Sequence, residues 1–141
     1  VIPNAEIRQK FLDKTVGYML TDGNVFAFQT TVAAYEQGEE WLSQLLSYIQ
    51  GNIDFLTQYI DQHLPKVKYI VPQASYLIFL DFRQLGLSQK ELVSLCTNQA
   101  HLALVDGSVF GKEGIGFMRI NLASPRSVIE KAAEQLLAIG Q

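Results

Sequence analysis

One long amphipathic segment, residues 39–64, constrains the fold of this chain more than any other stretch. Apolar side chains recur along it at steps of three and four residues, at Leu42, Leu45, Leu46, Ile49, Ile53, Leu56, Ile60 and Leu64. This spacing predicts an α-helix with one apolar face, about 39 Å long at ~1.5 Å per residue. A second apolar stripe lies beside the first, at Trp41, Tyr48, Phe55 and Tyr59. Two stripes indicate that the helix packs against two bodies, and Pro65 ends it.

Two shorter helices are predicted before this long one. Residues 5–20 carry apolar side chains at helical spacing, and we expect Ile7 and Phe11 to face inward. A turn follows at residues 21–24, where Thr-Asp-Gly-Asn is a typical turn sequence. Residues 25–37 predict a second helix, which Gly38 ends at the C′ position.

The pattern changes to that of a small sheet after Pro65. Residues 68–72, 74–82, 101–105 and 117–122 are rich in β-branched, aliphatic or aromatic side chains and predict four strands. Ser88 and Glu91 form a capping box that opens a helix, and Ser124-Pro125 is a typical start for the last helix. The expected fold class is α+β: a small mixed or antiparallel sheet, covered on one face by helices and preceded by a long interdomain helix.

Charge, hydropathy and cysteine content exclude several classes of protein. A net charge of −3 over 141 residues argues against nucleic-acid binding through a broad basic surface. We expect no membrane span, because no stretch approaches 18 consecutive apolar residues. The single cysteine, Cys96, lies in an apolar helical pattern and indicates a buried thiol in a reducing compartment such as the cytoplasm. His63 and His101 are far apart, so no metal site is expected.

The stretch GIGFMRINLASPR, residues 114–126, places a charge inside an apolar strand. At the two-residue period of a strand, Met118 and Ile120 share one face, and Arg119 lies on the other. A guanidinium stays charged at every accessible pH, so burying it requires an anion, either internal or from a ligand. Two interpretations remain open at this point. Arg119 either receives an external carboxylate, or it is paired internally or solvated on an edge strand.

A glycine-rich loop, residues 106–116, precedes this strand. Glycines allow backbone amides to approach a ligand closely. The loop matches neither a phosphate-binding P-loop nor a dinucleotide fingerprint, because no strand, GxGxxG and helix follow one another. The loop alone therefore identifies no ligand.

Several stretches together resemble a known family. The most specific are AAYEQGEEWL, DGSVFGKEGIGF and RINLASPR, within residues 33–126. They resemble the C-terminal small domain of class I/II aminotransferases, which are pyridoxal-phosphate (PLP) enzymes of fold type I. The upstream residues 23–56 are similar to the cystathionine β-lyase-like (C–S lyase) branch. The resemblance covers essentially the whole chain and implies that it is a C-terminal fragment.

The resemblance implies a domain organisation and a role for Arg119. Residues 1–38 would be the tail of the large PLP-binding domain, residues 39–64 the interdomain helix, and residues 65–141 the small domain. Arg119, in the R-x-N-x-A motif, would grip the α-carboxylate of a small amino-acid substrate.

The resemblance also implies the surroundings of the substrate. Asn24 would lie near the dimer interface and the neighbouring subunit's cofactor. Gly107, Phe110 and Gly111 would border the substrate entrance.

The family's catalytic lysine is the point at which the chain departs from the pattern. In the family, the Schiff-base lysine stands in a serine-rich motif upstream of the part matched here, and the seven lysines of this chain have no such context. We therefore expect no catalytic residue in this chain, no cofactor bound by it alone, and no activity alone.

The resemblance leaves the activity of the parent protein open. The parent is expected to be a cytoplasmic homodimer that binds PLP and cleaves a C–S bond by α,β-elimination. An aminotransferase is the close alternative. A non-enzymatic effector-binding domain of a regulator and a free-standing interaction module are more distant ones.

Overall fold

The computed structural model describes residues 1–18 and 23–140 of the chain. The chain divides into two compact units, Val1–Ser43 and Gln44–Gln141. The end of the predicted first helix and most of the predicted turn at residues 21–24 lie outside the described residues. Among the described helices, none combines the length and the hydrophobicity that a membrane crossing requires.

The first unit is helical and has no buried side chain among its described residues. It contains α1 (Ala5–Thr15), a 3₁₀ turn (Val16–Tyr18), α2 (Val25–Gln37) and the first residues of α3 (Glu39–His63). The expectation that Ile7 and Phe11 face inward is wrong, because both side chains are exposed. The buried core of the described chain begins only at Ile49, so the described residues of this unit provide no core for these side chains.

Gly38 joins α2 to α3 directly. Its amide donates to the Ala34 carbonyl at 3.0 Å, and its own carbonyl accepts from the Leu42 amide at 2.9 Å. The predicted end of the second helix at this residue is confirmed. The backbone of Gly38 is right-handed, with φ −88°, rather than in the left-handed conformation common at C′ glycines. Gly38 therefore closes the last turn of α2 and opens the first turn of α3.

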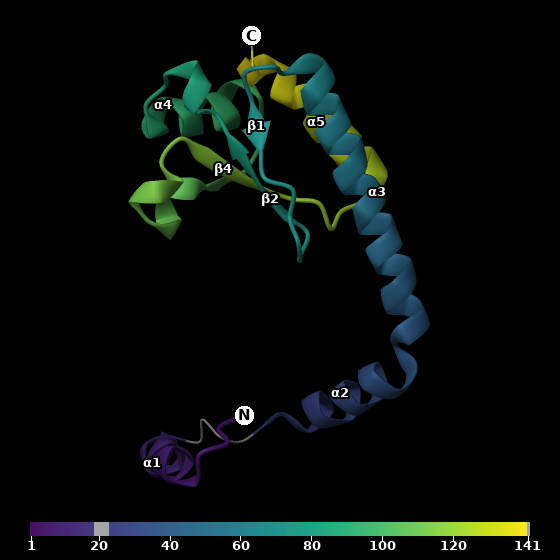
Figure 1. Cartoon of the computed structure of the whole chain (residues 1–141), viewed down its shortest axis with the longest axis vertical. Helices are drawn as coiled ribbons and strands as arrows, with labels where there is room; N and C mark the ends of the chain where they lie inside the picture. Colours follow the sequence, from purple (N-terminus) through teal and green to yellow (C-terminus); the bar gives the residue numbers. More distant parts are fainter. Residues whose placement is uncertain (19–22, 141) are drawn as a thin grey trace. The chain divides into compact units, whose positions relative to one another are not determined.

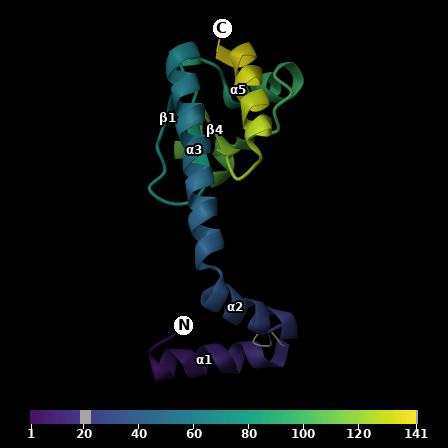
Figure 2. The ribbon, with the colours of Figure 1, turned by 90° about the vertical axis from the view of Figure 1, so that its right-hand side faces the viewer.

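The second unit is built on a four-stranded antiparallel sheet in the order β1-β2-β4-β3. Its strands are β1 (Lys68–Tyr69), β2 (Leu77–Asp81), β3 (Val105–Asp106) and β4 (Phe117–Asn121). Its helices are the remainder of α3, α4 (Gln89–Ser94), which continues as a π-helical turn (Leu95–Gln99), and α5 (Arg126–Gly140). Both α3 and α5 lie on one side of the sheet (Figures 1 and 2). The predicted α+β class with an antiparallel sheet is confirmed.

The core lies between the sheet and these two helices. Alternate side chains of β2 and β4 are fully or almost fully buried, at Ile78, Leu80, Met118 and Ile120. They belong to one cluster with the apolar faces of α3 and α5. Burying a side chain of this size stabilises the fold by about 1.5–3 kcal/mol. The opposite, only partly buried face of the sheet is therefore the one left to carry function.

Strand boundaries differ from the prediction for physical reasons. β1 has two residues instead of five, and its pairing weakens beyond Tyr69, where the Ile70 amide reaches the Phe79 carbonyl only at 3.4 Å. β3 begins at Val105 rather than at His101, whose φ of 55° is left-handed and incompatible with a strand. α5 begins at Arg126, immediately after the predicted Ser124-Pro125 start. The capping box at Ser88 is confirmed.

Candidate functional site

Arg119 lies at the centre of the partly buried face of the sheet. It is the third of the five residues of β4, and it pairs across the sheet with Phe79 of β2 and with Val105 of β3. Its neighbours along the strand, Met118 and Ile120, point into the core. The alternation predicted for this strand is therefore confirmed, and it places the guanidinium on the face that α3 and α5 do not cover.

The guanidinium of Arg119 has no acid partner among the described residues. Its Nε is buried and finds no acceptor within the described part of the chain. Its Cζ lies 4.7 Å from the centre of the Phe110 ring, a cation–π geometry. Arg83 shows the contrast, because its Nε and Nη2 donate to the two Asp81 oxygens at 2.9 and 2.7 Å. An internal ion pair, one of the two interpretations of Arg119, is thus not found among these residues.

The chemistry of such a guanidinium is anion binding. Arginine presents five N–H donors in one plane and matches a carboxylate through two parallel hydrogen bonds. A buried donor without an acceptor is costly, by about 1–3 kcal/mol or more for a charged group. A carboxylate reaching this face of the sheet would remove that cost.

The glycine-rich loop forms two short 3₁₀ turns, Gly107–Phe110 and Lys112–Gly114. Gly107 is buried, and a Cβ placed on it would collide with the backbone oxygens of Gly114 and Phe117. Gly111 has φ 120°, which favours glycine. Phe110 is half exposed, and its ring lies against Arg119. The structure therefore places Phe110 against Arg119. Gly107 and Gly111, before and after Phe110, allow the backbone conformation of the loop that carries it.

Asn24 lies in the first unit, where it caps α2. Its side-chain oxygen accepts a hydrogen bond from the Phe26 amide at 2.8 Å. Such a cap satisfies an unpaired amide at the helix start. The predicted place of Asn24 near a cofactor and a dimer interface stays a prediction.

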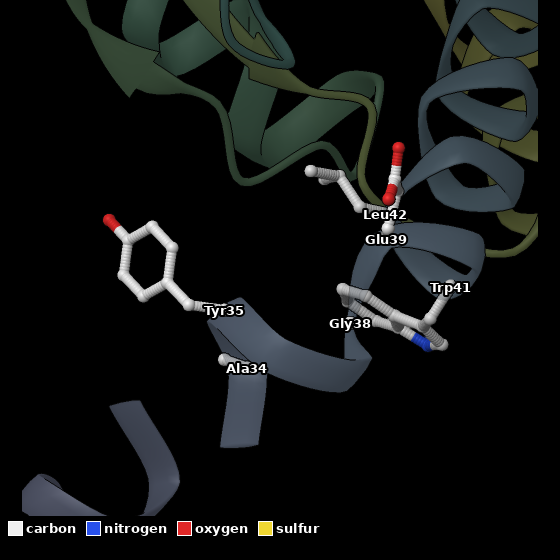
Figure 3. Close-up of a pocket in the computed structure, with 6 residues that line it drawn as sticks. All are labelled: Ala34, Tyr35, Gly38, Glu39, Trp41 and Leu42. Atoms are coloured by element: carbon white, nitrogen blue, oxygen red, sulfur yellow. The ribbon is translucent and has the colours of Figure 1, made fainter. Parts of the chain in front are cut away.

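An apolar hollow of about 510 Å³ lies at the α2–α3 junction of the first unit. Figure 3 shows Tyr35 on the last turns of α2, and Trp41 and Leu42 on the first turn of α3. Phe26 and Phe28 of α2 are also exposed. Exposed apolar surfaces of this kind are typical of places that bind another polypeptide or a ligand.

Three residues with positioning roles escaped the sequence reasoning. Phe79 stands on the strand face of Arg119 and could have been found from the period of its strand. Asn52 is fully buried in α3 and donates to the Leu122 and Ser124 carbonyls, just after β4. Gln89 bonds to residues on both sides of the glycine-rich loop. Nothing in the sequence signals the last two, because their partners are distant along the chain.

Comparison with solved structures defines the class of protein. The crystal structure named "PLP-bound putative aminotransferase from Clostridium difficile 630" superposes on this chain with a TM-score of 0.95 and 37% sequence identity. The match covers 100% of this chain and 36% of that one. No family model matches the chain. The fold is that of the C-terminal domain of PLP-dependent enzymes of fold type I.

Comparison with curated proteins narrows the class to a family. Cystathionine beta-lyase PatB of Bacillus subtilis (strain 168) is 35% identical over 138 residues, which are 98% of this chain and 36% of PatB. Protein MalY of Escherichia coli (strain K12) is 32% identical over 138 residues, 97% of this chain and 35% of MalY. Cystathionine β-lyase-like proteins of this kind are therefore homologues of the chain over nearly all of its residues. The chain spans about a third of the length of these relatives.

Proposed function

We propose that this chain is the C-terminal portion of a PLP-dependent C–S lyase, and that Arg119 binds the α-carboxylate of its amino-acid substrate. The observation that carries the proposal is the buried Nε of Arg119, which has no acceptor among the described residues. A substrate carboxylate would supply the missing acceptor. The match to PatB, which is named a cystathionine beta-lyase, supports this assignment because it extends over 98% of the chain.

In the proposed parent, Arg119 orients the substrate and the cofactor supplies the chemistry. PLP held by the rest of the parent would supply the electron sink for breaking the C–S bond by α,β-elimination. An aminotransferase also binds its substrate by the α-carboxylate, so Arg119 suits both reactions. Among the curated relatives, the match to the cystathionine beta-lyase PatB covers 98% of the chain, whereas the match to an aspartate aminotransferase of Pyrococcus abyssi covers 52%, which supports the lyase.

The residues of this chain do not fit the cofactor. A lysine that forms a Schiff base is activated by desolvation or by a neighbouring cation. All seven lysines are exposed instead: Lys10, Lys14, Lys66, Lys68, Lys90, Lys112 and Lys131. Their exposure supports the proposal that the Schiff-base lysine lies outside these 141 residues and that the chain alone is inactive.

The parent is proposed to be a cytoplasmic homodimer acting on small amino acids. The exposed apolar surface of α2 and of the start of α3 supports this organisation. Phe26, Phe28 and Trp41 would be covered there by the rest of the parent protein.

Arg119→Lys in the full-length parent tests the assignment of the carboxylate site. Lysine keeps the charge but loses the bidentate geometry. We expect the specificity constant to fall roughly 10- to 150-fold, which corresponds to a loss of about 1.5–3 kcal/mol of transition-state stabilisation. Arg83→Lys is the matched control, because Arg83 also stacks on a ring, that of Phe117, but already has Asp81 as its partner. A specificity constant unchanged by Arg119→Lys would remove Arg119 from the site.

Incubation of the isolated chain with PLP tests the assignment of the cofactor. We expect no visible absorbance of bound cofactor, because no lysine of the chain is desolvated. Borohydride treatment followed by peptide mass mapping gives the decisive result. A stoichiometric PLP adduct on one lysine, fixed by borohydride reduction of its Schiff base, would contradict the proposal that the cofactor lysine lies elsewhere.

A further inference from the structure

Phe110 is the described side chain that contacts the guanidinium of Arg119 by stacking. Its ring centre lies 4.7 Å from the Arg119 Cζ. The same ring meets Phe79 edge to face, with 5.5 Å between ring centres and 77° between ring planes. Phe79 is in turn the cross-strand partner of Arg119. Phe110 therefore contacts both Arg119 and Phe79, which are cross-strand neighbours on the partly buried face of the sheet.

An aromatic ring holds a guanidinium without consuming its donors. All five N–H bonds lie in the guanidinium plane, whereas the ring stacks on the face of that plane. The negative face of the ring attracts the cation. An acid partner would fix Arg119 equally well but would compete with an incoming carboxylate for the same N–H groups. The contact with the Phe110 ring restrains the group, and the buried Nε still has no acceptor among the described residues.

The loop that carries Phe110 is fixed at its base by one side chain. The Gln89 amide nitrogen donates to Asp106 Oδ1 at 2.6 Å, and its oxygen accepts from the Gly116 amide at 2.6 Å. Asp106 Oδ1 also accepts from the Ser108 amide at 2.8 Å. These bonds hold the two ends of the loop together, and this restrains the position of Phe110 over the sheet.

The exposure of Phe110 indicates that the side chain does not serve the core. The side chain is 52% exposed, and it is absent from the buried cluster that stabilises the unit. A ring placed for packing alone would gain more from burial inside that cluster. Substituting it should therefore leave the fold intact.

We infer that Phe110 is a positioning residue, which holds the guanidinium of Arg119 without engaging its N–H donors, so that a carboxylate can accept from them. The inference rests on the proposed carboxylate-binding role of Arg119 and adds the residue that prepares it. It predicts that the ring of Phe110, rather than its hydrophobicity, matters for anion binding.

Side-chain NMR of the full 141-residue chain tests this inference. Arginine Nε–Hε signals of ¹⁵N-labelled protein are followed while propionate is added at constant ionic strength, with propionamide as the neutral control. The variants are Phe110→Leu, Phe110→Tyr, which keeps the ring, and Val109→Ala, an exposed neighbour that serves as the control. Arg119→Gln assigns the signal and removes the guanidinium.

We expect Phe110→Leu to shift the Arg119 Hε signal, because the ring current is lost, and to weaken propionate binding about two- to fivefold. Phe110→Tyr and Val109→Ala should leave both unchanged. If Phe110→Leu leaves the Hε signal and the affinity unmoved while Arg119→Gln abolishes binding, the inference is overturned and the proposed function stands. If Arg119→Gln still binds propionate as the original chain does, the proposed role of Arg119 itself is wrong.

Discussion

Asn52 is a single side chain on which the placement of the strand carrying Arg119 depends. It is 0% exposed within α3, and its Nδ2 donates to the Leu122 carbonyl at 2.9 Å and the Ser124 carbonyl at 3.0 Å. These carbonyls follow β4 directly, so the bonds attach the end of the strand to the long helix. Asn52→Ala would leave both carbonyls without this donor.

The expected cost follows from the burial of each carbonyl. The Leu122 bond is buried and the Ser124 bond is partly buried, and an acceptor left unsatisfied costs about 1–3 kcal/mol. Alanine regains roughly 0.5 kcal/mol of helix propensity. Alanine also removes the Asn52 Oδ1, which is buried without a donor among the described residues. We therefore expect Asn52→Ala to lower the free energy of unfolding by about 1–3 kcal/mol. Urea denaturation of the full chain, with the slope unchanged, gives this value.

A control and a charged variant sharpen the test. Asn98 is exposed and donates only to Ser94 Oγ at 3.0 Å, so Asn98→Ala should change stability by less than about 0.5 kcal/mol. Asn52→Asp would place a carboxylate against two carbonyls and cost more than alanine at neutral pH. Burial raises the pKa of such a group, so its stability should recover as the pH falls and the acid gains a proton to donate. A loss below about 1 kcal/mol for Asn52→Ala would refute the reasoning.

Two further predictions concern titratable groups. Burial raises the pKa of the Cys96 thiol to about 11, so a disulfide reagent at pH 8 should modify the native chain far more slowly than the chain in urea, and equal rates would contradict the burial. The hydrogen bond from Arg83 lowers the pKa of Asp81 in the folded chain. As the pH falls, the carboxyl is therefore protonated in the unfolded chain before it is protonated in the folded chain. The contribution of the Asp81–Arg83 pair to the free energy of unfolding is lost as the pH falls below about 4. The urea midpoint of the original chain should therefore fall more steeply than that of Asp81→Asn between roughly pH 5 and 3, whereas parallel curves would show that the pair contributes nothing.

Periodicity along the chain was sufficient to predict the long helix and the face of the sheet on which Arg119 lies. The steps of three and four residues in α3 are a local property, and Ile49, Ile53, Leu56 and Ile60 are indeed buried. The two-residue alternation in β4 is equally local. Either pattern is visible without knowing what packs against it.

Strand ends and inward faces in the first unit were predicted less well. The conformation of His101 and the weak pairing beyond Tyr69 shorten β3 and β1, and neither appears in a hydropathy pattern. Ile7 and Phe11 follow helical spacing, yet spacing shows only that a helix has an apolar side. It does not show that the described residues supply a partner for that side.

The sequence by itself determined the class of fold, the alternation that places Arg119 on the partly buried face of the sheet, and the family resemblance, because each rests on neighbours along the chain or on a contiguous motif. The tertiary structure alone decided what surrounds the guanidinium. Phe79 and Phe110 meet Arg119 from another strand and from a loop, and Asn52 reaches Leu122 across 70 positions. The contacts of Arg119 form when β2 pairs with β4 and the loop folds over the sheet, and the Asn52 bond forms when the end of β4 packs on α3. Neither event can be read from neighbours along the chain.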